Sequence, residues 1–424
     1  MNFRRPWRVA LMISAVVSLV APMVSVAQAA TLATPWEILR ESPPGENLPA
    51  GVDLRTVPEK GTAEQSLTDK NTPEPVTFDG CYVSRPPADG YFKNRFSTCQ
   101  ITQLHYQRYA CPASACPLIG EAVVYVVVTR NMVPSQRRVV IGHRIQFAVL
   151  RGLPDTTRFG AAMTCAAKNT GGTAVCDVPE AKVTKSIAEW KARPVENTVF
   201  TMRGQDAPDP ADPPGIRAEK RAWYNLGRTL FVEGENGKVL DAPTLSTQAR
   251  CDVADYVQGS KCVFPRPAMF YVDLHDPETA EYGRLVADAL HGSVSSVYPG
   301  RLEGHYIPGN FSNSNGKRNH PITRIHHDQA AWQANKLIAE RYCQQRWGPK
   351  WHRDANGWPR ECAVYPFNST KDGAALSPGT SEGSSFAVNP VLEGDYLAME
   401  RSVNDFLSRH HILDGDTYWV WILY

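Results

Sequence analysis

Cationic and acidic residues separate sharply between two neighbouring stretches near the C-terminus. Residues 300–360 hold ten lysines and arginines against four acids, together with five histidines and four tryptophans. Residues 361–424 hold three lysines and arginines against nine acids. Cations bind the phosphates of a polyanion and aromatic rings stack on bases, whereas carboxylates hold hard divalent ions that stabilise charge at phosphorus. The pattern therefore favours metal-dependent phosphodiester chemistry, although a basic stretch can also be an ordinary solvated surface.

The basic stretch supplies the side chains that we expect to bind DNA. Contacts to phosphate are independent of base sequence and weaken steeply with salt. The candidates are Lys317, Arg318, Arg324, Lys336, Lys350 and Arg353. Because the formal net charge of the whole chain is only +2, this evidence is regional.

Several short motifs after Cys251 occur together in a specific order. They are Pro277-Glu278-Thr279, Ile322-Thr323-Arg324-Ile325, Asn335-Lys336, Tyr365-Pro366-Phe367 shortly after Cys362, Lys371-Asp372-Gly373-Ala374 and Leu413-Asp414-Gly415-Asp416. In these motifs the segment 251–424 resembles the secreted NucA/NucB-type deoxyribonucleases. The resemblance implies an α+β domain with a ββα-metal core, DNA as substrate, and one Mg²⁺ or Mn²⁺ as cofactor. Mapped onto this chain, the core has strands at Cys362–Phe367 and Ser385–Leu392 and a helix over Gly394–Arg409.

The resemblance also nominates metal ligands. Asp395 and Asn404 stand where the family has helix asparagines, and Asp372 stands where it has a downstream glutamate. Nine residues span about two and a half helical turns, so the start of the helix must bend inward if Asp395 and Asn404 are to reach one ion. Asp395 can alternatively serve as a helix N-cap, and Asn404 as a solvated helix residue.

The chain departs from the family at the general base. The acidic pair of the family motif is Ala363-Val364 here, and alanine cannot accept a proton from water. Three interpretations follow: an inactive DNA-binding relative, a weak enzyme, or an enzyme whose base has moved. Glu361 lies two residues before Ala363 and so projects from the same face of a strand, about 6–7 Å away. His326 and His327 form the second candidate, because imidazole accepts protons near neutral pH.

The remaining sequence indicates an exported protein with a β-rich first half. Arg4, Arg5 and Arg8 precede an apolar stretch and a small-residue site at Ala27-Gln28-Ala29, which predicts a signal peptide over residues 1–29. A mobile leader is expected over 30–75, a disulfide-stapled β domain over 76–205 and a Pro-rich linker or loop over 206–216. The connection over 217–250 is uncertain, because residues 217–240 could still add a final strand pair to the β domain, and the nuclease-like domain follows at 251–424. The β domain has a hairpin expected between Cys165 and Cys176, and its binding partner is not specified.

All ten cysteines follow the signal in neighbouring couples. An even count in an exported chain favours disulfides, including Cys251 with Cys262 and Cys343 with Cys362. No apolar run after the signal is long enough to span a membrane, and no nucleotide cofactor is expected. The sequence therefore predicts a secreted, metal-dependent DNA endonuclease, with a catalytically silent DNA-binding protein as the alternative.

Overall fold

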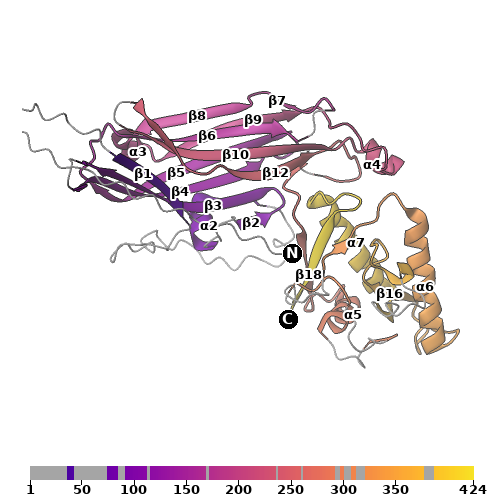
Figure 1. The fold of residues 1–424 in the computed structure, drawn as a ribbon. Coiled ribbons are helices and arrows are strands. Elements are labelled where there is room, and N and C mark those ends of the chain that lie inside the picture. The colour runs from indigo at the N-terminus through magenta and orange to yellow at the C-terminus, as the bar shows by residue number, and fades with distance from the viewer. Residues whose placement is uncertain are drawn as a thin grey trace, which may run out of the picture.

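The computed structural model describes residues 36–42, 74–84, 91–111, 115–168, 171–234, 237–258, 261–291, 297–299, 307–311, 320–376 and 386–424. Within these ranges the chain forms a large β unit followed by a smaller mixed unit, drawn in indigo to pink and in orange to yellow in Figure 1. The signal segment 1–29, Lys317 and Arg318 lie outside the described residues. No described helix is long and apolar enough to cross a membrane.

The β unit is a sandwich of two antiparallel sheets. The strands of the first sheet lie in the order β1-β3-β4-β5-β9-β7, with β2 paired to β3. Their bounds are β1 Trp36–Ser42, β2 Tyr91–Asn94, β3 Ser97–Tyr109, β4 Leu118–Met132, β5 Arg138–Arg151, β7 Val175–Cys176 and β9 Val195–Arg203. The mobile leader expected over 30–75 is wrong at residues 36–42, which form β1 and pair with β3. The apolar runs at 121–129 and 138–150 lie in β4 and β5. Long runs of β-branched residues at these positions suit a strand packed on both faces.

The second sheet corrects the expected domain boundary. Its strands lie in the order β13-β12-β10-β6-β8, with β11 paired to β10. Their bounds are β6 Arg158–Ala167, β8 Glu180–Ser186, β10 Ala222–Glu233, β11 Val239–Asp241, β12 Leu245–Cys251 and β13 Cys262–Val263. Since β10 is the central strand, residues 217–263 belong to the sandwich, and the boundary lies after Val263 rather than at 206–216. The Pro-rich segment is a loop that leads into the short helix α4 (Pro214–Ala218).

One apolar core lies between the two sheets. It includes Val126 from the first sheet and Leu230 from the second, and the helix α3 (Ile187–Ala192) adds Trp190. The short helix α2 (Phe78–Ser84) covers the opposite face of the first sheet, where Cys81 packs with Cys99 and Tyr125. The expected hairpin between Cys165 and Cys176 is wrong, because β6 and β7 belong to different sheets and this disulfide joins the two layers.

The C-terminal unit combines helices with short strands. Its elements are β14 Ala268–Asp273, α5 Ala280–His291, β15 Ile322–Thr323, α6 Gln329–Trp347, β16 Arg360–Tyr365, the 3₁₀ turn η4 Ala374–Leu376, β17 Ala387–Leu392, α7 Glu393–Arg409 and β18 Thr417–Leu423. Strand β18 lies between β14 and β15 in one sheet, and β16 pairs with β17 in a second. The α+β class is therefore confirmed. The expected strands at 362–367 and 385–392 correspond to β16, which lies two residues earlier at both ends, and to β17, which begins two residues later. The expected helix corresponds to α7.

The hairpin β16–β17 is buried on both faces, because alternate side chains of a strand point to opposite sides. Ala363 and Tyr365 pack with α5 and α7, whereas Cys362 and Val364 pack with α6. Helix α7 follows β17 without an intervening loop. The acids Glu393 and Asp395 in its first turn favour this helix start, since carboxylates are stabilised near a helix N-terminus.

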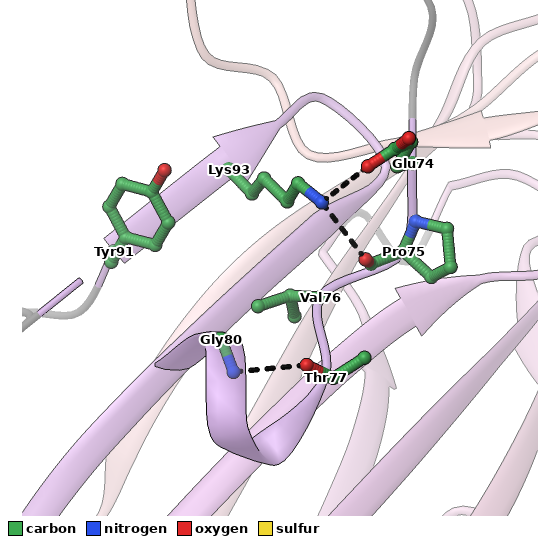
Figure 2. A pocket seen from close by; sticks show the side chains of 7 residues that line it. All are labelled: Glu74, Pro75, Val76, Thr77, Gly80, Tyr91 and Lys93. Carbon is green, nitrogen blue, oxygen red and sulfur yellow. Dashed lines mark hydrogen bonds and ion pairs between the residues drawn. The ribbon is translucent and has the colours of Figure 1, made fainter. Parts of the chain in front are cut away.

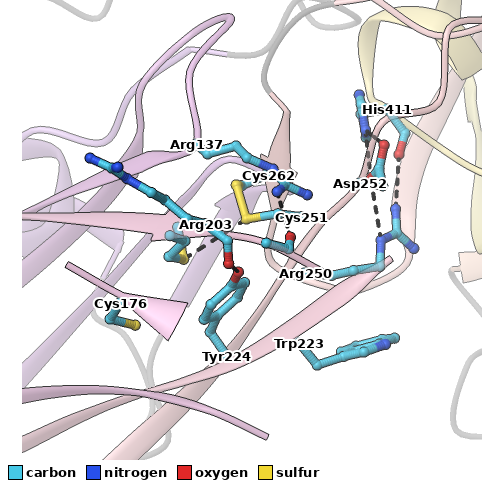
Figure 3. Close-up of a disulfide and its surroundings, with 12 residues drawn as sticks. Arg137, Cys176, Arg203, Trp223, Tyr224, Arg250, Cys251, Asp252, Cys262 and His411 are labelled. Atoms are coloured by element: carbon cyan, nitrogen blue, oxygen red, sulfur yellow. Dashed lines mark hydrogen bonds and ion pairs between the residues drawn. A yellow bond between two sulfur atoms is a disulfide. The ribbon is translucent and has the colours of Figure 1, made fainter. Parts of the chain in front are cut away.

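All five predicted cysteine pairs are confirmed as disulfides: Cys81–Cys99, Cys111–Cys116, Cys165–Cys176, Cys251–Cys262 and Cys343–Cys362. The Cys251–Cys262 bond, shown in Figure 3, joins β12 to β13 and lies in the β unit rather than in the nuclease-like domain where the sequence placed it. The Cys343–Cys362 bond ties α6 to the start of β16.

We expect the Cys343–Cys362 bond to stabilise the C-terminal unit. The two cysteines are 19 residues apart. In the chain-entropy account, closing a loop of this size lowers the entropy of the unfolded chain and so raises its free energy by about 3 kcal/mol. Replacing both cysteines with serine should reduce the free energy of unfolding by that amount in urea without reductant. An unchanged urea midpoint, or a free thiol found at either position by intact mass measurement, would contradict this expectation.

A buried charge network joins the two units. Asp416, just before β18, accepts hydrogen bonds from Arg95 at 2.7 Å and from Arg250 at 2.5 Å, and both arginines belong to the β unit. Nearby, His411 Nε2 lies 2.8 Å from a carboxylate oxygen of Asp252, as Figure 3 shows. The side chains of Arg95, Arg250, Asp252 and His411 are almost fully inaccessible to solvent. The loop 410–416 is therefore part of the contact between units.

Candidate functional site

A group of ionisable side chains lies around Tyr396 of helix α7. Burial raises the pKa of the Tyr396 phenol, and the charges of Glu400, Glu361 and Glu340 raise it further, whereas a hydrogen bond from Asn368 lowers it. These residues come from α7, β16, α6 and the loop after β16. We call Glu400, Tyr396, Glu361, Lys336 and Asn368 the Glu400 site.

Glu400 is the most perturbed acid of this group. Burial raises the pKa of its carboxyl to about 7, and the ammonium group of Lys336 partly opposes the shift. Lys336 also lies 3.9 Å from Glu340, one turn further along α6. A carboxyl that titrates near neutral pH can hold or release a proton at working pH, which is typical of acids in functional sites.

Several oxygens of the Glu400 site have no partner. Within the described part of the chain, no hydrogen bond or ion pair engages the carboxylate of Glu400 or of Glu361. Asn368 is fully buried and donates from Nδ2 to Tyr396 Oη at 3.3 Å, but its Oδ1 has no hydrogen-bond partner among the described residues. Leaving a buried polar oxygen unpaired is costly, so an external ligand or water would stabilise this arrangement.

The loop that carries Asn368 is held by a neighbouring asparagine. Asn335 on α6 donates from Nδ2 to the carbonyl oxygens of Asn368 and Thr370, each at 2.9 Å, and its Oδ1 accepts from Ala375 N at 2.8 Å. A Cβ at Gly373 would lie 2.4 Å from the Asn335 side chain, so only glycine fits there. The Asn335 and Gly373 motifs therefore position the site rather than act in it.

The structure does not bring the three nominated metal ligands together. Asp395 Oδ2 accepts from Glu281 N at 2.8 Å and thus caps the start of α5 rather than its own helix. Asn404 is exposed on α7. Asp372 Oδ2 accepts from Thr323 N at 2.7 Å and fixes β15. Asp395 and Asn404 lie on one uninterrupted helix, where Asp395 is used in the contact with α5 and Asn404 faces solvent, so the two do not form a ligand pair.

Both histidines nominated as bases face the β unit. His326 stacks on Tyr256 with ring centroids 3.5 Å apart, and burial together with the neighbouring charge of Arg324 lowers its pKa to about 4. His327 Nε2 lies 3.0 Å from Glu219 Oε1, and Glu219 also accepts from Tyr256. These imidazoles therefore help to join the units, and neither contacts a residue of the Glu400 site among the described interactions.

The nominated phosphate contacts have different surroundings. Arg324 is buried and donates to the carbonyl oxygen of Ile412, so it is not available to DNA. Lys336 belongs to the Glu400 site. Lys350 and Arg353 are exposed in the segment between α6 and β16. Lys317 and Arg318 lie outside the described residues.

The position of the family base is closed to solvent. Ala363 is fully buried in the apolar core between β16 and the helices α5 and α7. Glu361, two residues earlier on the same face, is only partly buried and contributes to the charge around Tyr396. The carboxylate of Glu361 is therefore better placed to reach water than a carboxylate at position 363 would be.

The oxygen donors of the Glu400 site are of the type that binds divalent metal ions. Mg²⁺ prefers oxygen ligands and commonly uses one or two carboxylates plus water, and this site offers the Glu400 carboxylate and the unpartnered amide oxygen of Asn368. No three histidine, cysteine, aspartate or glutamate side chains of the described ranges converge as a metal cage. Any ion here would thus keep much of its water shell.

A pocket lies on the β unit. Figure 2 shows this pocket of about 430 Å³, lined by Glu74, Pro75, Val76, Thr77, Gly80, Tyr91 and Lys93. Its lysine and its acid are bonded to each other, with Lys93 Nζ 2.9 Å from Glu74 Oε2. This pairing leaves the pocket without an evident nucleophile or base.

Glu400 was missed by the sequence analysis although it lies between Asp395 and Asn404. Its spacing gives one signal: Tyr396 and Glu400 are four residues apart and so share a helix face, as do Lys336 and Glu340. Which of these side chains come together depends on how α6 and α7 pack against the two faces of the β16–β17 pair, which the sequence does not reveal.

Comparison with protein-family models, with curated proteins and with solved structures found no match. The functional assignment therefore rests on the residues of this chain and on their arrangement.

Proposed function

We propose that the chain is an exported, metal-dependent deoxyribonuclease and that the Glu400 site is its active centre. The observation that carries the proposal is the half-buried carboxylate of Glu400, whose pKa is near neutral, which has no partner among the described residues and which acts electrostatically on Tyr396 and with Lys336. The same Tyr396 accepts a hydrogen bond from Asn368, a buried amide whose oxygen is unpartnered among the described residues. The order of two antiparallel strands followed by a helix agrees with the motif resemblance. Five disulfides are consistent with a location outside the reducing cytosol.

The proposed chemistry is hydrolysis of a phosphodiester. Glu400 and Asn368 would hold Mg²⁺ or Mn²⁺, which when bound supplies Lewis-acid stabilisation of charge on the phosphoryl oxygens. Glu361 accepts the proton of the attacking water as the water oxygen bonds to phosphorus and the bond to the leaving oxygen breaks. Lys336 donates to the phosphate and offsets its negative charge. The leaving oxygen takes a proton from solvent.

The alternative function is a catalytically silent DNA-binding protein. It is favoured by one observation, the burial of alanine at the position where the resembling family has its acid. Under this alternative the exposed cations still bind phosphate, but no water is activated. The two functions predict the same DNA affinity and different DNA products.

Incubation of the mature protein with supercoiled plasmid and Mn²⁺ separates these functions. The enzyme should convert supercoiled plasmid to relaxed circles, and EDTA should prevent this. Glu361→Gln should slow nicking by ~10²–10⁴-fold, the contribution of a positioned general base, while DNA binding in EDTA is retained. DNA binding without nicking would instead support the silent protein, and nicking unaffected by Glu361→Gln would remove Glu361 from its role.

A further inference from the structure

The segment that joins α6 to β16 is exposed, basic and rich in tryptophan. We call residues 346–360 the tryptophan loop. It contains four lysines and arginines against one acid, and three tryptophans. Trp358 is 63% exposed and Trp347 is 41% exposed, whereas Trp351 packs against the core beneath α6. Two large apolar rings thus face solvent among cations.

The tryptophan loop is internally ordered. Asp354, its one acid, accepts hydrogen bonds from the backbone N–H groups of Asn356 and Trp358 at 2.8 and 2.9 Å. Arg353 donates to the carbonyl oxygen of Gly357 at 2.9 Å, and Gly357 has a φ of 84°, which favours glycine. The acid is therefore used in folding the turn, and Trp358 is presented from a fixed backbone.

Both ends of the tryptophan loop are attached to the C-terminal unit. The Cys343–Cys362 disulfide brackets it. Arg360 donates to the carbonyl oxygen of Pro390 at 2.9 Å, and the carbonyl oxygen of Pro359 accepts from Glu393 N at 3.1 Å. Trp358 consequently stands beside the first residue of α7.

We propose that the tryptophan loop binds an unpaired DNA strand and that Trp358 stacks on one of its bases. This inference rests on the proposed function in taking DNA as the ligand. An exposed indole offers its face to a base, while Lys350 and Arg353 offer charge to the flanking phosphates. Bases of an intact duplex stack on each other and do not present a free face, so the stacking contact selects unpaired DNA.

Helix α7 leads from its contact with the tryptophan loop to Glu400. Glu393 and Glu400 are seven residues apart on α7, which places them on one face and about 10.5 Å apart along the axis. That span takes about three nucleotides at the duplex rise of ~3.4 Å each, and fewer in an extended unpaired strand. When one base stacks on Trp358, a phosphate only a few nucleotides along the same strand would therefore lie at Glu400.

Binding of the full chain to fluorescent oligonucleotides in EDTA tests the proposal without cleavage. Trp358→Ala should weaken binding of a single-stranded oligonucleotide by about tenfold, since stacking on one aromatic ring contributes that order of affinity, and should change affinity for a hairpin duplex less than about twofold. Trp358→Phe should retain most of the single-strand affinity. Trp36→Ala is the matched control, because Trp36 is 57% exposed on β1 of the β unit, and it should change neither affinity.

The proposal is overturned if Trp358→Ala weakens single-strand and duplex binding equally, or weakens neither. Equal loss would mean that the tryptophan loop recognises only phosphate. This outcome is distinct from failure of the proposed function. A protein that prefers single strands through Trp358 but never nicks DNA supports the loop assignment and contradicts the nuclease. A protein that nicks DNA but shows no single-strand preference through Trp358 supports the nuclease and contradicts the loop assignment.

Discussion

Glu400→Gln should abolish metal-dependent DNA cleavage and at the same time stabilise the folded protein above neutral pH. The loss of cleavage should be on the order of 100-fold or more, since metal stabilisation of phosphoryl charge supplies several kcal/mol. DNA binding in EDTA should remain, because the exposed cations of the tryptophan loop are unchanged. Asp405→Asn is the matched control: Asp405 is an exposed acid of the same helix that pairs with Arg409 at 3.0 Å.

The stability effect of Glu400→Gln follows from its raised pKa. Burial lifts this pKa from 4.5 to about 7, so the folded state binds more protons than the unfolded state between these values. The free energy of unfolding of the wild-type protein should then fall, relative to the variant, as pH rises from about 4.5 to 7, and the difference should be constant above that range. Urea denaturation at pH 4 and pH 8 without metal measures it. A variant that is less stable than wild type at pH 8 would show that Glu400 forms a stabilising interaction instead.

Asp416→Ala should be the most destabilising single change at the contact between the units. It leaves Arg95 and Arg250 buried without their shared carboxylate, and breaking a buried ion pair from one side costs about 3–5 kcal/mol. Urea unfolding of the wild type should be a single transition because the network joins the units, whereas the variant should show separate transitions. Asp405→Ala, which removes an exposed ion pair, should cost less than about 1 kcal/mol.

The milder Asp416→Asn variant tests the same contact by its pH dependence. Burial alone would raise the pKa of the Asp416 carboxyl, but Arg250 and Arg95 lower it below the ordinary 3.8. A carboxyl with a lowered folded-state pKa adds stability above its unfolded pKa, and that stability is lost as pH falls toward the folded value. The difference between wild type and Asp416→Asn should be full at neutral pH and shrink below about pH 4. A difference that stays constant from pH 7 to pH 3 would exclude the ionised carboxylate as its source.

The sequence predicted the local elements better than the division into units. The β-branched runs of β4 and β5 and the adjacent couples of cysteines gave correct strands and disulfides, because both depend on near neighbours in the chain. The boundary was misplaced since β10 pairs with β6, more than fifty residues earlier. Proline-rich composition at 206–216 indicated a loop but carried no information about which sheet received the following strand.

The candidate site was predicted only in part for a related reason. Glu361 and Lys336 were selected from the sequence, whereas Glu400 was counted among the acids without a role. Asp395 was favoured as a metal ligand from its position in the motif. The motif does not show that its carboxylate accepts a hydrogen bond from the start of α5. His326 and His327 were selected as bases because the sequence does not show that they contact Tyr256 and Glu219. Those partners lie about 70 and 108 residues earlier in the chain. Such long-range contacts decide whether a polar side chain is free to act.

The rate of plasmid nicking as a function of Mn²⁺ concentration, measured in parallel for the wild type, Glu400→Gln and Asp405→Asn, tests whether the Glu400 site is a metal-dependent active centre. We predict saturable, EDTA-sensitive nicking by the wild type and Asp405→Asn, and at least about 100-fold slower nicking by Glu400→Gln at every Mn²⁺ concentration. Nicking by Glu400→Gln at the wild-type rate, or no nicking by any of the three proteins while each still binds DNA, would contradict the assignment of the Glu400 site as a metal-dependent active centre.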